Sequence, residues 1–430
     1  MPRIIILHGV NYWNAGDLGI IRSMVLRLRE EIPSTTIHIH SIFGDIERAR
    51  EITDWDESIR EIPYIVTYPF KNGVEALVGS ISLLSTLVYG ILYHFLKIKA
   101  RFLLTSRQAA IIDDLMESDV VLSKGGNFFL DKGRGLPGFT LHLHQILLSI
   151  LLRKPTVIYA QSIGPFKRKW TYTVLKAVLR KVDLVLLREP CSFDFLKGLK
   201  GPVVKITADE AFLLPAVSGE RARELLKMNG IEGNRIVGIT VLDWSYPFSP
   251  DPIERRQKYI ASLASVADWL IKERAAEVFF VPHLVGFWGT NDLEIVEQII
   301  QHMRCQQQVR ILGTYTAEEI KGILGQADIV IGTRMHSNIF ALAAGTPCLV
   351  ISYLPKCVGI MRMLGLEEWV IPIEDITPEV LCDRTKDLLE KAPVIRAHLR
   401  DVVPEMKEKA RENARLVRIL VEMSQQRSAA

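Results

Sequence analysis

Short apolar, β-branched runs alternate along this chain with longer segments in which apolar residues recur at helical spacing. Such alternation is typical of βαβ units, in which a strand of a parallel sheet is followed by a helix. We therefore expect an α/β fold with two Rossmann-like, doubly wound parallel sheets that face a central cleft. The expected strands of the first sheet are 3–10, 36–42, 64–67, 120–123, 156–160, 184–187 and 203–206, and those of the second are 236–241, 278–281, 309–312, 329–331, 348–351 and 369–371.

The length of the chain agrees with two domains. A chain of 430 residues exceeds what one hydrophobic core usually serves. A segment with Pro, Ser and Gly at 215–219 separates the two series of strands. We expect an N-terminal domain at 1–214, a C-terminal donor-binding domain at 220–392, and a charged helix at 393–430. This helix is interrupted near Pro404 and can pack back across both domains.

Composition favours a cytoplasmic globular protein. Hydrophobic residues make up 48% of the chain and charged residues 24%, as in folded domains. The five cysteines are scattered and lack CxxC spacing, which argues against a disulfide framework or a structural zinc site. The N-terminus runs directly into an expected strand, so we predict no signal peptide.

One segment within an apolar insert at 74–101 has the composition of a membrane helix. From Ala76 to Leu96 no residue is charged, and Lys97, Lys99 and Arg101 follow. A single span would place expected strands of one sheet on opposite sides of a bilayer. The segment is therefore either a buried helical hairpin or an insertion that lies in the membrane interface.

The N-terminal half also carries an excess of basic residues. No acidic residue occurs between Asp131 and Asp183, whereas many lysines and arginines do. One face should be basic, which suits a membrane surface or a phosphate-bearing acceptor, an ordinary solvated face, or nucleic acid. No aromatic-interleaved RNA-binding motif accompanies it, so we expect no nucleic-acid partner.

Three turns of small or polar residues follow expected strands of the first half. They are Asn14 to Asp17, the Gly125-Gly126 turn after Lys124, and Gln161 to Pro165. In a parallel sheet such turns meet at the carboxyl edge, where ligands of open α/β folds bind. Each turn alone could equally be structural; their agreement predicts a binding edge.

Two charged residues close strands at the same expected edge. Arg188 follows 184–187, where it either binds an anion, as we favour, or pairs with Glu189 or Asp194. Asp209 follows the last expected strand of the first half. Its role is either that of a helix cap or hinge residue or that of a catalytic residue.

The strongest constellation lies in the second half. Arg334, Met335 and His336 follow the strand at 329–331, and no Asp or Glu occurs from Ile329 to Leu366. We therefore expect a positive local field. A histidine beside an arginine at a strand-to-helix crossover is placed to move a proton on a bound ligand. A weaker companion loop holds His283, Asn291 and Asp292.

These residues together resemble the polysaccharide pyruvyl transferase family. The resemblance rests on Asn14 to Asp17, the Gly125-Gly126 turn, Gln161 to Pro165, Arg188-Glu189, Thr207 to Asp209, Arg334 to His336, Ala344 to Pro347 and Ser352-Tyr353, in that order over about residues 3–370. It implies an architecture similar to the GT-B glycosyltransferases, phosphoenolpyruvate as the donor substrate, and a pyruvate ketal on a sugar of a cell-surface or lipid-linked glycan. It also implies that Arg188, Arg334 and His336 serve the donor. Lys124 departs from the family, which more often has glycine there.

The side chains present suit this chemistry. Guanidinium groups bind the carboxylate and phosphate of phosphoenolpyruvate bidentately, and His336 can act as general acid and base without a metal or a cofactor. Our assignments are as follows: His336 and Asp17 as catalytic; Arg188, Arg334, Lys356, Met335, Gly125 and Gly126 as donor-binding; Asn14, Gln161 and His283 as acceptor-binding. The alternatives are a nucleotide-sugar glycosyltransferase of the same architecture and a non-catalytic glycan-binding protein. We expect the protein in the cytoplasm, peripheral at the inner face of the membrane.

Overall fold

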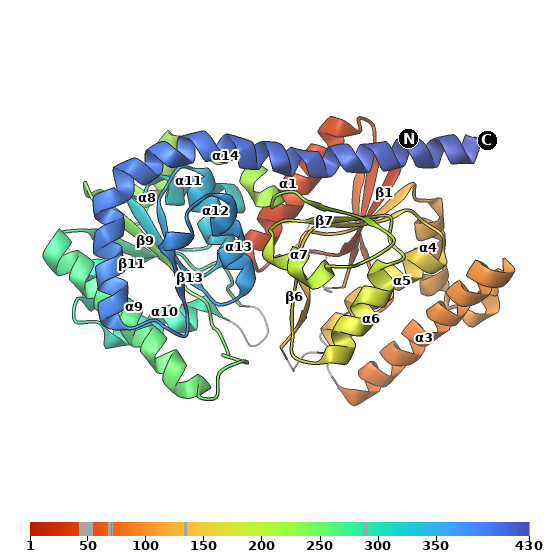
Figure 1. The fold of residues 1–430 in the computed structure, drawn as a ribbon, viewed down its shortest axis with the longest axis horizontal. Coiled ribbons are helices and arrows are strands. Elements are labelled where there is room, and N and C mark those ends of the chain that lie inside the picture. The colour runs from red at the N-terminus through yellow and green to blue at the C-terminus, as the bar shows by residue number, and fades with distance from the viewer. Residues whose placement is uncertain (43–54, 68–69, 71, 133–135, 287–290, 430) are drawn as a thin grey trace. The chain divides into compact units, whose positions relative to one another are not determined.

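The computed structural model describes residues 1–42, 55–67, 70, 72–132, 136–286 and 291–429, and within them the prediction of two parallel-sheet α/β domains is confirmed (Figure 1). The chain divides into two units. Unit 1 comprises Met1–Tyr12, Met24–Asp209 and Ala410–Ala430, and unit 2 comprises Trp13–Ser23 and Glu210–Lys409. The division differs from the predicted one, because unit 2 takes a short segment from near the N-terminus.

Unit 1 contains an eight-stranded sheet in which every neighbouring pair is parallel. The strand order is β3-β2-β1-β4-β6-β7-β8, with β5 paired to β6. The order reverses between β1 and β4, which is the position where doubly wound sheets form a ligand crevice. The strands are β1 (Arg3–His8), β2 (Thr36–Ser41), β3 (Ile59–Pro63), β4 (Val120–Ser123), β5 (Gly126–Asp131), β6 (Thr156–Phe166), β7 (Leu184–Leu187) and β8 (Val203–Ile206).

The helices of unit 1 form more than one layer. Helix α5 packs on β1, β5 and β6, and α6 and α7 pack on β6. Helix α3 packs on α5, so it lies outside the layer that covers the sheet (Figure 1). The helices are α1 (Ala15–Glu31), whose first half belongs to unit 2, α3 (Gly73–Leu96), η1 (Arg101–Leu103), α4 (Ser106–Glu117), α5 (Leu136–Leu151), α6 (Lys169–Leu179) and α7 (Cys191–Leu196).

Unit 2 contains a six-stranded parallel sheet in the order β11-β10-β9-β12-β13-β14. This is the Rossmann order, with its reversal between β9 and β12. The strands are β9 (Ile236–Thr240), β10 (Glu277–Phe280), β11 (Val309–Ile311), β12 (Ile329–Gly332), β13 (Cys348–Ser352) and β14 (Val370–Pro372). The helices are η2 (Glu210–Leu213), α8 (Gly219–Met228), α9 (Pro252–Arg274), α10 (Asp292–His302), η3 (Gln306–Gln308), α11 (Ala317–Gln326), α12 (Met335–Ala343), α13 (Pro355–Met363) and η4 (Glu367–Trp369).

The C-terminal helix differs from its prediction. Helix α14 (Pro378–Ala429) begins earlier than expected and continues through Pro393 and Pro404. A proline removes one backbone hydrogen bond and kinks a helix, but it does not have to end it. The expected interruption near Pro404 is therefore wrong. The helix contributes residues to unit 2 as far as Lys409 and to unit 1 from Ala410.

One expected strand of unit 1 is corrected, and two strands, β3 and β5, were not predicted. The apolar run at 64–67 follows β3 and does not form part of it, although Tyr64, Ile65 and Val66 are buried in the core. Strand β5 begins at Gly126, which belongs to the predicted Gly125-Gly126 turn. Its pairing with β6 is irregular, with two register shifts.

The apolar insert forms one helix, so the helical-hairpin interpretation is wrong. Helix α3 has 24 residues, begins at the N-cap Asn72 and ends at Lys97 in the left-handed conformation. By length and composition it could cross a membrane, and only 22% of its most apolar window is buried.

Candidate active site

The carboxyl edge of the sheet in unit 2 positions Arg334 and His336 at the strand reversal. The amide of Thr333, just after β12, donates to the carbonyl of Thr240 at the end of β9 over 3.0 Å. The Ser337 hydroxyl donates to the Arg334 carbonyl over 2.6 Å and accepts from Thr240 Oγ1, also over 2.6 Å. The turn from β12 into α12 is therefore fixed to the neighbouring strand. This rigidity sets the positions of the two side chains that the turn carries.

Arg334 is held by a carboxylate that the sequence analysis did not assign to it. Its Nε and Nη2 donate to the two oxygens of Asp292 over 2.7 Å and 2.5 Å, and the Asp292 side chain is fully buried. One oxygen of Asp292 also accepts from the amides of His283 and Leu284, each over 3.0 Å. Burial opposes the charge of Arg334, but the nearby Asp292 carboxylate raises the pKa of the guanidinium.

The expectation of an unneutralised positive field around Arg334 is therefore wrong. The interval 329–366 lacks acids, but Asp292 reaches it from the start of α10. Burial of an arginine requires such a partner, because an unpaired charge in the interior is costly. Within the described residues, Arg334 Nη1 makes no hydrogen bond, so this nitrogen is the part of the guanidinium that can bind a ligand.

His336 lies directly against the first turn of α1. A methyl group at Gly16 would lie 2.5 Å from His336 Nδ1. The turn before α1 is fixed by Asn14, whose side-chain oxygen accepts from the amides of Gly16 and Asp17 over 3.0 Å and 3.3 Å. Asn14 and Asp17, both predicted site residues, therefore lie in unit 2 beside His336, at the N-terminal end of a helix, where anions are favoured.

His283 completes the cluster. Its carbonyl accepts from the Ala15 amide over 3.0 Å. The ring is 3% exposed, and neither ring nitrogen has a hydrogen-bond partner among the described residues. Burial, together with the nearby Arg334 and His336, lowers the pKa of His283 to about 3. The ring is therefore neutral at physiological pH, beside the catalytic candidates.

The other two predicted residues of unit 2 have different surroundings. Lys356 lies in the first turn of α13, and its Nζ is 5.0 Å from the ring centre of Tyr353. Met335 is 3% exposed and belongs to the core. A core side chain makes few contacts with a ligand, so the donor-binding assignment of Met335 has no support from its position.

Gly16→Ala tests the close approach of α1 to His336. Alanine has a higher helix propensity than glycine, so by propensity alone the substitution would stabilise α1. The contact with the imidazole should instead displace the ring, slow turnover at least about tenfold, and lower the free energy of unfolding by about 1–3 kcal/mol. Gly313→Ala is the matched control, because nothing lies within 4 Å of a methyl group there. Equal turnover of both variants would contradict the contact.

The strand reversal of unit 1 carries a second polar cluster. His8, at the end of β1, donates from Nδ1 to Gln145 Oε1 and accepts at Nε2 from Ser123 Oγ, both over 2.7 Å. His142 Nδ1 lies 3.0 Å from His8 Nδ1. His8 has φ 81°, a conformation that non-glycine residues rarely adopt. Such strain is typical of functional positions.

The predicted residues after β4 are buried in this cluster. Lys124 is fully buried, with Nζ 5.3 Å from the ring centre of Phe128. Gln161 is fully buried, and its amide donates to the Lys124 carbonyl. Gly125 and Gly126 are also buried, and a methyl group at Gly126 would contact Phe128. The four residues therefore lie together, packed against one another.

Buried neutral histidines predict acid sensitivity of unit 1. Burial lowers the pKa of His8 to about 3 and that of His144 to about 4, against about 6.5 in an unfolded chain. Between these values the unfolded chain binds more protons, so each histidine contributes stability that is complete above pH 6.5 and is lost as the pH falls. We expect urea unfolding to show a loss of about 1 kcal/mol per pH unit for each histidine.

His144→Gln should reduce that slope by about one proton. His302→Gln is the control, because His302 is exposed and bonds only to the Gln298 carbonyl among the described residues. Identical slopes in the wild type and His144→Gln would contradict this prediction.

Arg188 has an acidic partner, contrary to our preference for a bound anion. Its Nη1 donates to Asp209 over 2.6 Å and its Nε to Ser162 over 2.8 Å, and it is fully buried. Of the two acids weighed in the sequence, Glu189 accepts from Ser192 and Asp194 pairs with Lys197. The pair explains why Asp209 closes its strand.

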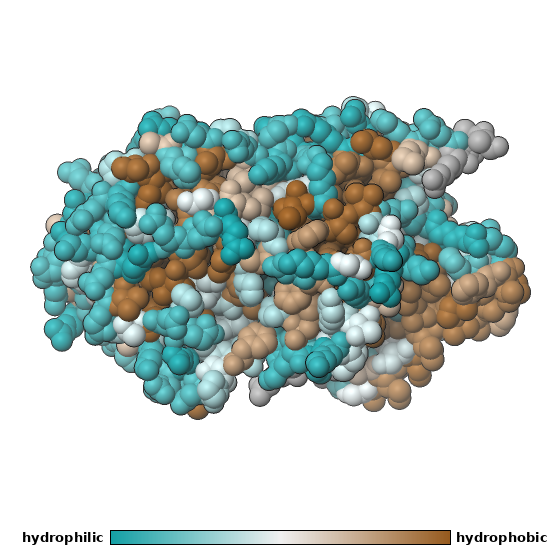
Figure 2. All heavy atoms as spheres, viewed as in Figure 1, coloured by the Kyte–Doolittle hydropathy of each residue, from teal (hydrophilic) through white to brown (hydrophobic). Residues whose placement is uncertain are grey.

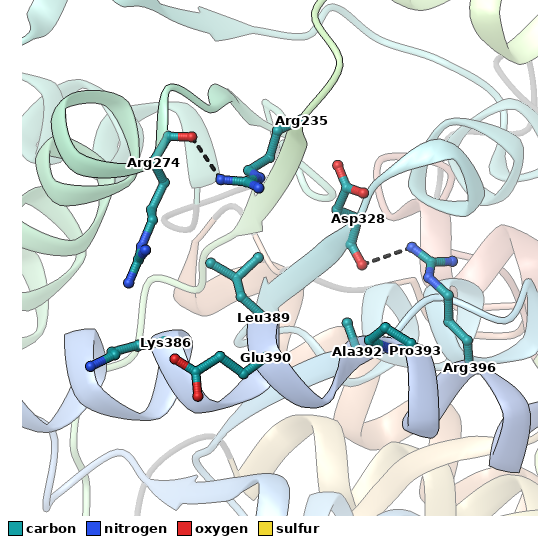
Figure 3. A pocket seen from close by; sticks show the side chains of 9 residues that line it. All are labelled: Arg235, Arg274, Asp328, Lys386, Leu389, Glu390, Ala392, Pro393 and Arg396. Atoms are coloured by element: carbon teal, nitrogen blue, oxygen red, sulfur yellow. Dashed lines mark hydrogen bonds between the residues drawn. The ribbon is translucent and has the colours of Figure 1, made fainter.

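A separate pocket lies at the opposite edge of the sheet in unit 2 (Figure 3). Its volume is about 310 Å³. Arg235 Nη1 donates to the Arg274 carbonyl over 2.9 Å, and Arg396 Nη2 donates to the Asp328 carbonyl over 2.7 Å. Because these arginines hold backbone carbonyls at the amino ends of the strands, this pocket is not the candidate active site.

The structure thus brings Asn14, Asp17, His283, Arg334 and His336 together in unit 2. It gathers Gly125, Gly126 and Gln161 in unit 1, with Lys124. Sequence reasoning noticed Asp292 but not its role as the partner of Arg334. The available signal was its position at the start of a helix after β10.

The fold has clear relatives among solved structures. UDP-GlcNAc 2-epimerase from Neisseria meningitidis, solved with UDP-GlcNAc, is 11% identical with a TM-score of 0.60, and the match covers 98% of this chain and 100% of that one. Sucrose-phosphate synthase from Thermosynechococcus elongatus is 12% identical with a TM-score of 0.55, covering 100% and 99%. The protein therefore has the two-Rossmann-domain fold of GT-B glycosyltransferases and UDP-GlcNAc 2-epimerases.

The sequence places it more narrowly within that fold. Residues 14–355 match the model of the polysaccharide pyruvyl transferase family. The chain belongs to this family, as its motifs predicted. The amylovoran biosynthesis protein AmsJ of Erwinia amylovora is 26% identical over 285 residues, which cover 65% of this chain and 67% of AmsJ.

Proposed function

We propose that this protein transfers the pyruvyl group of phosphoenolpyruvate to two hydroxyls of a sugar, as a ketal. The observation that carries the proposal is the position of His336, which lies at the strand reversal of unit 2 and against the N-terminal turn of α1. Membership of the pyruvyl transferase family supports the same reaction.

The donor is a small dianion or trianion with a carboxylate and a phosphate. Arg334 offers Nη1, while Asp292 holds the other two nitrogens. Helix α12 begins at Met335 beside His336 without a side-chain cap, so its first backbone amides can face an anion. The amides in the first turn of α1 are already bonded, so α1 contributes only the positive end of its dipole. A guanidinium fixed on one side and open on the other binds an anion with little loss of side-chain entropy.

The transfer requires a proton at a carbon atom. His336 gives a proton to the methylene carbon of phosphoenolpyruvate, and one sugar hydroxyl adds to C2 and loses its proton. A second hydroxyl then forms the second C–O bond at C2, the bond from C2 to the phosphate oxygen breaks, and inorganic phosphate leaves. The two hydroxyls together lose two protons. One of them balances the proton that the new methyl group has gained, and the other leaves with phosphate or solvent. Asp17 and His336 are the candidate bases.

The acceptor contacts fall to Asn14 and His283. Asn14 uses its side-chain oxygen to cap α1, so its amide nitrogen can donate to a sugar hydroxyl. His283 is neutral and can accept or donate. The acceptor is a glycan, in keeping with the family, and we propose that it is lipid-linked or destined for the cell surface.

A direct assay compares donors. The purified protein is incubated with phosphoenolpyruvate, or separately with UDP sugars, and a panel of oligosaccharide acceptors, and release of phosphate or UDP is measured. We expect phosphate release that requires both phosphoenolpyruvate and an acceptor. UDP release, or thermal stabilisation by UDP sugars without any by phosphoenolpyruvate, would instead support a glycosyltransferase. Stabilisation by a glycan with no release would indicate a binding protein.

A further inference from the structure

Helix α3 exposes an apolar face along its whole length. Leu77, Ile81, Leu84 and Phe95 are 59–71% exposed, and their spacing places them on one side of a helix. Val88 and Ile91 fill the same line, and Ile98 and Phe102 extend it past the helix end. Figure 2 shows this apolar surface over α3. Soluble monomers rarely expose so continuous a patch unless it binds something.

The opposite side of α3 fixes the helix to unit 1. Gly79, Thr86, Tyr89 and Gly90 are buried. Gly90 lets Leu151 of α5 approach to 3.0 Å from where a methyl group would lie, and Thr86 Oγ1 lies 3.1 Å from His144 Nε2. The inner side of α3 therefore packs into the core of unit 1 through Tyr89 and two glycines, whereas its outer side consists of apolar side chains without such packing.

Basic residues gather at one end of this face. Lys97 and Lys99 follow the helix, and Arg153 donates to the His94 carbonyl over 2.6 Å. Arg101 is paired with Asp113 over 2.5 Å. The acidic residue of the helix itself, Glu75, lies at the other end. The C-terminal rim is therefore cationic, which suits a surface of anionic headgroups.

The connections of α3 exclude a transmembrane position. β3 precedes it and β4 follows it in the same sheet, so both ends must stay on one side. The helix is about 36 Å long at 1.5 Å per residue, and it packs on α5. With these limits, its outer face can enter only the interfacial region of a bilayer.

We propose that the outer face of α3 binds unit 1 to an anionic lipid bilayer, with the helix parallel to the membrane plane and Lys97, Lys99 and Arg153 at the headgroups. A second copy of the chain would have to cover an aliphatic stripe whose rim is cationic at one end. Lipid tails and anionic headgroups satisfy both features. This inference does not depend on the transferred group.

Sedimentation with vesicles tests the proposal. The full-length protein is mixed with vesicles of phosphatidylcholine alone or with added phosphatidylglycerol. We expect binding to the mixed vesicles, and at least about tenfold weaker binding for the double variant Leu77→Ser/Leu84→Ser, since both side chains are exposed and lose apolar contact with lipid. Lys99→Glu should weaken binding several-fold, and only to the anionic vesicles.

Ile253→Ser/Val394→Ser is the matched control, because both residues are exposed apolar side chains of unit 2. It should bind like the wild type. Phosphate release with a soluble acceptor should be the same for all variants, which separates membrane binding from catalysis. Wild-type protein that stays in solution with anionic vesicles would overturn the proposal. So would a dimer in light scattering that the α3 double variant alone dissociates.

Discussion

His336→Ala should abolish turnover and leave the affinity for phosphoenolpyruvate within a few-fold. The imidazole lies at the strand reversal of unit 2, against Gly16, and in our proposal it delivers the proton that makes C2 electrophilic. General acid and base groups contribute about 10²- to 10⁴-fold in rate, so the loss should be at least about 100-fold. Phosphate release in the presence of an acceptor measures turnover, and calorimetric titration measures donor binding.

His302→Ala is the matched control for this variant. His302 is exposed at the end of α10, away from the strand reversal, and its removal should leave turnover unchanged. Full activity of His336→Ala would remove His336 from the mechanism. A large loss of donor affinity with unchanged maximal rate would assign it to binding.

Arg334→Ala should weaken donor binding at least about tenfold and also destabilise unit 2. Without the guanidinium, Asp292 would remain buried as an unpaired carboxylate, although it still accepts from two amides. Loss of one partner of a buried ion pair costs about 3–5 kcal/mol. Donor titration and urea unfolding measure the two effects separately.

Arg362→Ala provides the contrast. Arg362 and Glu367 are both about half exposed, with 3.8 Å between Nε and the carboxylate oxygen, and such surface pairs contribute about 0–1 kcal/mol. Arg334→Ala that loses stability but keeps its donor dissociation constant would make Arg334 a purely structural residue. Unchanged stability would contradict the buried pair itself.

The periodicity of the sequence predicted most strands because buried parallel strands are continuous apolar runs. The run at 64–67 shows the limit of that reasoning, since a chain can bury Ile65 and Val66 without making them part of a strand. Strand β5 shows the opposite case, because its irregular pairing with β6 leaves no clear pattern.

The sequence could predict which site residues lie at the ends of strands, but not which residues from other parts of the chain contact them. Asn14, Asp17, Arg334 and His336 each follow an expected strand, so their common edge could be inferred. The partner of Arg334 could not, because Asp292 comes from a different part of the chain and meets it only through tertiary packing. The absence of acids in a stretch of sequence says nothing about acids that arrive from elsewhere.

Neither unit is a contiguous piece of the chain, and this limits how the protein can be taken apart. A fragment that starts at Glu210 would contain β9 to β14, but it would lack Trp13–Ser23, the segment that carries Gly16 and places Asn14 next to the His283 turn. A fragment that ends at Asp209 would in turn lack Ala410–Ala430. Two such halves should therefore complement each other only if each can still dock its missing segment, from α1 or from α14, which the other half carries. Cutting the gene at the linker 215–219 should yield no piece that is active by itself.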